Sequence, residues 1–148
     1  MDIFLVPPSN VAGLVPALLP YLKESEERTR GRALAEDLVD MVLAGRMQLW
    51  VVEKEAIPYG HIITEIKEYP RCKMLTVQYC AMKPWTMDIV SEKMHSIAER
   101  FAKDAGCAGV EFVGRPGWRN VAKENGYEIQ SVMYQKFFKE AEHGPVKH

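Results

Sequence analysis

The sequence predicts a mixed α/β domain with one central sheet and helices on both of its faces. Two observations favour this class. Short apolar runs that suit strands alternate along the chain with longer amphipathic stretches that suit helices. Hydrophobic residues make up 47% of the 148 residues and charged residues 26%, which is the composition of an ordinary globular domain with one core.

The N-terminal third is expected to hold one strand and two helices. A short apolar run at 3–6 predicts the strand, and leucines at helical spacing predict a helix after Pro7. Pro20 is expected to kink or end this helix, because proline removes a backbone donor. The charged stretch 23–32 is expected to be a solvated link, and a second helix follows it and ends at Gly45.

The middle of the chain predicts three strands and the clearest helix. The strands are expected at 48–53, 59–66 and 74–82, where β-branched and aromatic residues are frequent. The helix is expected at 86–105, where Val90, Met94, Ile97 and Phe101 form an apolar stripe that ends before Gly106.

The C-terminal part predicts a short buried strand at 110–113, a helix at 115–125 and one long strand at 127–138. The element order is therefore β-α-α-β-β-β-α-β-α-β. We expect a single domain over residues 1–140 and a flexible tail over 141–148. The long final strand has no turn residue, and an unbroken strand that ends as an exposed edge predicts a homodimer.

Charge and hydropathy argue against several classes of protein. The net charge is −1 and lysines and arginines form no run, so we expect no nucleic-acid partner. No apolar stretch approaches the ~20 residues of a membrane span, so we expect no membrane partner. The N-terminus lacks the pattern of a signal peptide, which predicts a cytoplasmic location. Cys72, Cys80 and Cys107 have no metal-ligand spacing, so they are expected to be free thiols, and no metal site is predicted.

Four short motifs, taken in order, carry a family resemblance. They are P-Y-G-H-I-I, A-M-K-P, S-I-A-E-R-F-A-K-D-A-G and V-A-K-E-N-G-Y. Their order and spacing resemble those of the GCN5-related N-acetyltransferase (GNAT) superfamily over about residues 2–138. The stretch G-R-P-G-W further resembles a divergent branch often found in bacteriophage genomes, which would place the protein in the host cytoplasm or in the virion.

The resemblance implies a cofactor site where the fourth and fifth strands splay apart. Acetyl-coenzyme A would lie there, with its thioester arm along the backbone of Cys80, Ala81 and Met82. Lys83 and Arg115 are the candidate cationic contacts. For a general base, the resemblance points to Glu65 as the first candidate and Tyr79 as the second.

The sequence also departs from the family pattern at two places. The turn Lys83–Asp88 is about two residues short and contains no glycine, although glycine lets backbone amides approach a diphosphate. Asp88 falls in the first helical turn, and Thr86 is expected to cap the helix. Ala122 occupies the position of the tyrosine that many members use as a proton donor. These departures predict a degenerate cofactor site.

Two functions therefore remain open, and the sequence does not decide whether the protein is an enzyme. The first is an N-acyltransferase that transfers an acetyl group from acetyl-coenzyme A to an amine. The second is a catalytically inactive, phage-encoded domain that acts in assembly, in the virion or on a host protein.

Single residues that could carry chemistry have simpler structural interpretations. Cys80 is expected to be a buried small residue rather than a nucleophile, and His61 and His95 are expected to be structural. Trp85 and Trp118 stay open between lining a cleft and packing.

Overall fold

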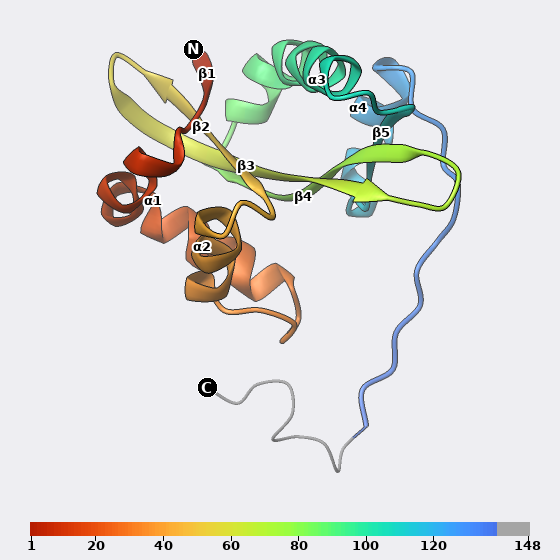
Figure 1. Ribbon diagram of the computed structural model, residues 1–148, viewed down its shortest axis with the longest axis horizontal. Helices are drawn as coiled ribbons and strands as arrows, with labels where there is room; N and C mark the ends of the chain where they lie inside the picture. The colour runs from red at the N-terminus through yellow and green to blue at the C-terminus, as the bar shows by residue number, and fades with distance from the viewer. Residues whose placement is uncertain (139–148) are drawn as a thin grey trace.

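The computed structural model describes residues 1–138 and shows the predicted class, with one sheet and helices on both faces (Figure 1). The sheet has five strands in the order β1-β2-β3-β4-β5. All neighbours are antiparallel except β4 and β5, which are parallel. The strands are β1 Asp2–Leu5, β2 Gln48–Lys54, β3 Ile57–Glu68, β4 Lys73–Met82 and β5 Gly109–Phe112.

The helices divide between the two faces of the sheet (Figure 1). α1 (Pro8–Arg28) and α2 (Ala35–Leu43) cover one face, and α3 (Thr86–Asp104) covers the other. A short 3₁₀ helix, η1 (Pro116–Trp118), and α4 (Arg119–Glu124) follow β5.

Alternation along the strands builds a core on each face. In β2, Leu49 and Val51 join the core beneath α1 and α2, while Trp50 and Val52 join the core beneath α3. Successive strand side chains point to opposite faces, so a single strand serves both cores.

The expected break at Pro20 is wrong, because α1 runs unbroken through Pro16 and Pro20. Both prolines lie on the exposed face of the helix, four residues apart. Each leaves a backbone carbonyl one turn earlier without its usual partner, and on this face water can satisfy that carbonyl. Pro8 stands in the first turn, where the missing N–H costs nothing.

The expected solvated link at 23–32 is also wrong over most of its length, because α1 continues to Arg28. Helical spacing instead brings its opposite charges together, as in the Lys23–Glu26 pair at 3.5 Å and the Glu24–Arg28 pair. The turn that follows is held by Glu26, whose Oε1 accepts a hydrogen bond from the Ala35 amide at 2.7 Å.

The predicted final strand is the largest error, because residues 127–138 are extended but pair with no strand. A strand pattern is stabilised only by a neighbouring strand, and this segment runs away from the sheet after α4 (Figure 1). The predicted tail at 141–148, and the end of the predicted domain at 140, lie outside the described residues.

Candidate functional site

The candidate site begins where β5 separates from β4. Four residue pairs join these parallel strands, from Met74–Gly109 to Val77–Phe112. Beyond Val77, the β4 residues Tyr79–Met82 pair with β3, but no residue from Gln78 to Met82 has a β5 partner in the described chain. The C-terminal half of β4 therefore has an open edge, as the resemblance implied for Cys80, Ala81 and Met82.

A β-bulge in β4 lies at the same point. Ile63 pairs with Tyr79 and Thr64 pairs with Val77, so Gln78 is an extra residue on β4. A bulge bends its strand and locally strengthens the twist. The bend at Gln78 therefore coincides with the separation of β4 from β5.

Arg28 reaches this open edge from the last turn of α1. Its Nη1 donates a hydrogen bond of 2.7 Å to the carbonyl of Cys80, which shows that this carbonyl points away from β3. Glu24, one turn earlier, forms an ion pair with the same guanidinium. One of the backbone acceptors that the open edge offers is therefore already occupied by a side chain of the protein.

Cys80 is not a nucleophile in this arrangement. Its side chain packs in the core beneath α3 together with Met82 and Trp118. Burial raises the pKa of the Cys80 thiol to about 12, although Arg28 and Arg115 oppose the shift. The thiol is therefore protonated near neutral pH.

Trp118 has a packing role at the mouth of the separation. It belongs to the core beneath α3, and its ring lies 5.9 Å from that of Phe112, the last residue of β5. It therefore fills part of the space between α3 and the diverging strands.

The start of α3 differs from the expected cap. Trp85, not Thr86, is the N-cap residue, and its side chain makes no capping hydrogen bond. Thr86 is the first helical residue and is buried, so its hydroxyl does not close the helix end as predicted. In the described structure only the Thr86 amide is bonded in this turn, to the carbonyl of Lys83 at 3.2 Å, and no side chain accepts from the amides that follow. The helix end thus keeps part of its affinity for an anion, despite Asp88 in the first turn.

Trp85 and Lys83 shape the loop before this helix end. Trp85 has a φ of 71°, in the left-handed region that glycine adopts most easily, and its side chain is 79% exposed. The Lys83 amide donates to the Tyr59 carbonyl at 2.8 Å, and the Lys83 ammonium lies 4.5 Å from the Tyr59 ring centroid. The loop thus has a glycine-like backbone conformation without a glycine.

The two candidate bases lie together on the sheet face that α1 and α2 cover. Gln78 Nε2 donates to Glu65 Oε1 at 2.7 Å, and Tyr79 packs against the core beneath α1 and α2. Burial raises the pKa of the Tyr79 phenol, and the nearby Glu65 carboxylate adds to the rise. Tyr79 is therefore protonated near neutral pH, so its phenol can donate a proton but does not act as a base.

Glu111 is a carboxylate that the sequence interpretation missed. It lies in the centre of β5, and its Oε2 accepts hydrogen bonds from the Tyr69 hydroxyl at 2.6 Å and the Thr76 hydroxyl at 2.9 Å. The hydrogen bond to Glu111 raises the pKa of Tyr69. Thr76 also pairs directly with Glu65 across β3 and β4, so two carboxylates flank one threonine beside the separation. The signal in the sequence was a single acidic residue between Val110 and Phe112.

The two histidines have structural contacts. His61 is fully buried, and its Nε2 lies 2.9 Å from the Ser25 hydroxyl. Burial lowers the pKa of His61 to about 4, so the ring is neutral near pH 7. His95 Nδ1 lies 3.0 Å from the Tyr127 hydroxyl, and burial lowers the pKa of His95 and raises that of Tyr127 to about 12.

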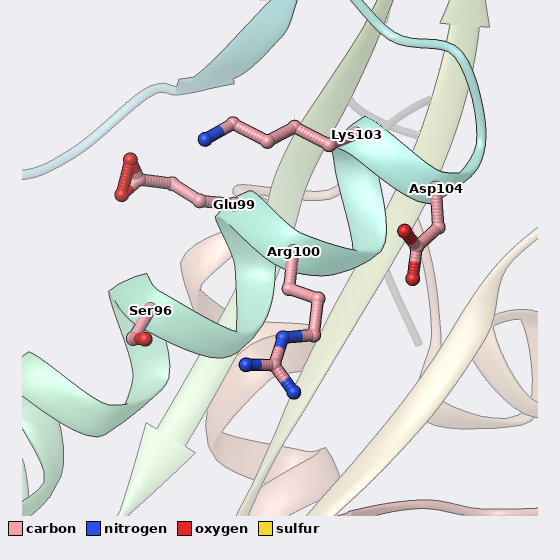
Figure 2. A pocket seen from close by; sticks show the side chains of 5 residues that line it. All are labelled: Ser96, Glu99, Arg100, Lys103 and Asp104. Atoms are coloured by element: carbon pink, nitrogen blue, oxygen red, sulfur yellow. The ribbon is translucent and has the colours of Figure 1, made fainter.

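A shallow hollow of about 290 Å³ lies elsewhere, on the outer surface of α3 (Figure 2). Its lining comes from one helix only, namely Ser96, Glu99, Arg100, Lys103 and Asp104. Figure 2 shows these side chains spread apart rather than directed at a common point. The hollow therefore adds nothing to the site at β4.

Two other kinds of site are absent from the part of the chain that the structure describes. No three His, Cys, Asp or Glu side chains among residues 1–138 gather as metal ligands would. Over the same residues, no helix has the length and apolar character that a bilayer crossing requires.

A sheet whose parallel strands β4 and β5 separate beside the start of a helix defines the fold of the GCN5-related N-acetyltransferases. Comparison with solved structures supports this assignment. A GCN5-related N-acetyltransferase from Ralstonia eutropha JMP134 matches with a TM-score of 0.68 and 14% identity, over 92% of this chain and 97% of that protein. The chain therefore has the GNAT fold.

Two further structures with this fold were solved with ligands. An aminoglycoside acetyltransferase from an uncultured soil metagenomic sample, in complex with sisomicin, has a TM-score of 0.71 and 13% identity over 93% of this chain and 96% of that protein. A predicted acetyltransferase from Clostridium acetobutylicum, with acetyl-CoA, has a TM-score of 0.68 and 11% identity over 94% and 97%. No protein-family profile matches the chain, and no curated protein matches it by sequence.

Proposed function

We propose that the protein is an N-acyltransferase that transfers an acetyl group from acetyl-coenzyme A to an amine, through a degenerate cofactor site. The observation that carries this proposal is the open edge of β4 beyond the Val77–Phe112 pair. An unpaired strand edge offers the donors and acceptors that an extended amide-containing chain requires. Coenzyme A would supply the activated acyl group.

The residues present fit this cofactor in part. The open edge of β4 fits its amide-containing arm, and the start of α3 together with Lys83 and Arg115 provides positive potential for its phosphates. The missing glycine and the bulky Trp85 argue against a backbone cradle for the diphosphate. Side-chain cations at the surface would hold it instead, so we expect weaker binding than a glycine-rich loop would give.

The acceptor side follows from the carboxylates beside the separation. Glu65 would take a proton from the attacking amine, and the second carboxylate, Glu111, would add negative potential that favours a cationic amine. Ala122 in α4 cannot donate a proton, so the chain leaves protonation of the departing thiolate to water.

Calorimetric titration with acetyl-coenzyme A tests the proposal. We expect measurable heat at millimolar ligand, and about fivefold weaker binding in the double variant Lys83→Met/Arg115→Met, since two partly exposed charge contacts contribute about 1 kcal/mol together. The matched control Arg46→Met/Lys54→Met removes two exposed cations elsewhere and should bind like the wild type. No heat from the wild-type protein at millimolar ligand would reject the enzyme.

We propose as the alternative a catalytically inactive, phage-encoded domain that acts in assembly, in the virion or on a host protein. The observation that favours it is that side chains of the protein occupy part of the open edge of β4. Arg28 binds the Cys80 carbonyl there, and Trp118 packs in the same core as Cys80. Portal, capsid or tail genes beside the coding sequence would support this alternative, together with the absence of heat in the titration. Metabolic genes beside it would argue against it.

A further inference from the structure

The outer edge of β5 is open. Within residues 1–138, β5 pairs with β4 alone and ends the sheet. It contains neither proline nor lysine, which proteins often place on an edge strand to prevent pairing with another chain. The backbone groups of Gly109–Phe112 that point away from β4 therefore have no strand partner among the described residues.

The segment 128–138 has the complementary property. It is extended, contains no glycine or proline, and lies in no strand. Six large apolar side chains in it are at least half exposed, namely Ile129, Val132, Met133, Tyr134, Phe137 and Phe138. Such a concentration of exposed apolar side chains marks an interaction surface.

Contacts within the chain direct this segment away from its own β5. Tyr127, just before it, is fixed by His95 and by the Phe112 ring, whose centroid lies 5.0 Å from its own. From there the chain leaves the sheet and runs toward the turn between α1 and α2 (Figure 1). In that turn, Arg32 Nη2 donates to Gln135 Oε1 at 3.0 Å. The same guanidinium lies 5.6 Å from the centre of the Phe137 ring.

We propose that residues 128–138 of one copy add as a strand to β5 of a second copy, and that the exchange is reciprocal. The occupant is a second copy because the same chain carries both an unpaired strand edge and an unpaired strand-forming segment that its own contacts hold apart. A two-fold arrangement uses each edge and each segment once per copy and leaves neither unpaired. Strand addition supplies backbone hydrogen bonds, and burial of the apolar side chains stabilises the pair.

Light scattering after size exclusion tests the exchange on the full chain. We expect the wild type at twice the 16.9 kDa of one copy. The variant Val132→Pro/Met133→Pro removes adjacent backbone donors, so it breaks the ladder whichever of the two faces β5. We expect it at the monomer mass with the helical far-ultraviolet circular dichroism signal of the wild type, which shows that the domain is folded. The matched control Val132→Ile/Met133→Leu keeps the donors and the apolar character and should remain dimeric.

Hydrogen exchange of the wild-type protein gives a second measurement that needs no variant. We expect the amides of 128–138 to be protected, and this protection to be lost on dilution to the monomer. A wild-type monomer overturns the proposal, whether or not 128–138 is protected, because protection in a monomer means pairing within one chain. A dimer that survives the double proline variant, or one in which 128–138 exchanges freely, also overturns it, because the interface then lies elsewhere.

Discussion

Residues 1–102 and residues 103–138 differ sharply in how they are packed. Every buried residue of the described chain lies in the first region, and Ala102 is the last of them. β5, η1, α4 and the extended segment contribute only half-buried and exposed side chains. All fully buried residues of the hydrophobic core therefore precede β5, and later residues such as Val110 and Trp118 pack against it while half-buried.

This difference assigns the two regions different tasks. Buried apolar area dominates folding stability, so the first region carries most of it. The second region contributes Glu111 and Arg115 to the candidate site and presents the free edge of β5, so it adds surface that can bind without adding fully buried residues. Parts of a protein that bind or move are commonly drawn from its less stable parts.

The comparison is tested most strongly by truncating one side chain in each region. Leu38 in α2 is fully buried, whereas Val113 after β5 is 77% exposed. Leu38→Ala should lower the free energy of unfolding by about 3 kcal/mol, the usual cost of a cavity in a rigid core. Val113→Ala should change it by less than about 0.5 kcal/mol. Urea denaturation measures both, and equal losses would show that the two regions do not differ in this way.

The two histidines test the same contrast through pH. An unfolded His61 has a pKa of about 6.5, and burial lowers the folded value to about 4. The unfolded state therefore binds more protons in this window, and stability should fall as pH drops from about 6.5 to 4, by about 3 kcal/mol in total.

His61→Gln should flatten this pH dependence more than His95→Gln, because His95 lies at the border of the two regions beside Tyr127. The measurement is urea denaturation at several pH values. An unchanged profile in His61→Gln would show that another group controls it.

Two glycines sharpen the comparison within the first region. A Cβ on Gly60 in β3 would meet the carbonyl oxygen of Ala81 in β4, the strand that lines the candidate site. A Cβ on Gly13 in α1 would meet nothing within 4 Å. Gly60→Ala should therefore cost about 2 kcal/mol by overpacking. Gly13→Ala should stabilise the protein by up to about 1 kcal/mol, because alanine favours a helix. Melting temperatures that move in the same direction would contradict the close approach of β3 and β4 at Gly60.

The smallest effect concerns Arg28, which links the well-packed region to the open edge. Arg28→Ala frees the Cys80 carbonyl, and one hydrogen-bond acceptor of this kind is worth about 1 kcal/mol, so acetyl-coenzyme A should bind about fivefold more tightly. Arg46→Ala, which removes an exposed arginine after α2, should leave the affinity unchanged. Titration calorimetry gives both constants, and weaker binding in Arg28→Ala would mean that the guanidinium contacts the ligand instead.

The sequence predicted the well-packed region better than the other one. Apolar side chains at strand or helix spacing indicate directly which residues are buried. Such patterns occur at 48–53 and in the stripe of Val90, Met94, Ile97 and Phe101, so the strands and α3 lie where they were expected. The predicted break at Pro20 was wrong because the rule that proline ends a helix does not consider which face of the helix is exposed to water. The segment 127–138 misled because strand propensity does not say whether a partner strand is present.

The candidate site was predicted in outline only. The backbone of Cys80, Ala81 and Met82 was named from the family resemblance alone, and this part of β4 has no β5 partner among the described residues. Glu111 and Arg28 enter through tertiary contacts between residues far apart in the chain, and no local pattern indicates these contacts. The capping error at Thr86 has a similar origin, because the backbone conformation of Trp85 decides where the helix begins.

The three indole rings give the molecule built-in optical probes at three depths. Trp50 is buried and meets the Phe101 ring edge-on at 5.2 Å, Trp118 is half-buried beside the separated strands, and Trp85 projects into solvent before α3. Their emission and their quenching by acrylamide would therefore report, in one unlabelled sample, on the interior, on the strand separation and on whatever approaches the helix start.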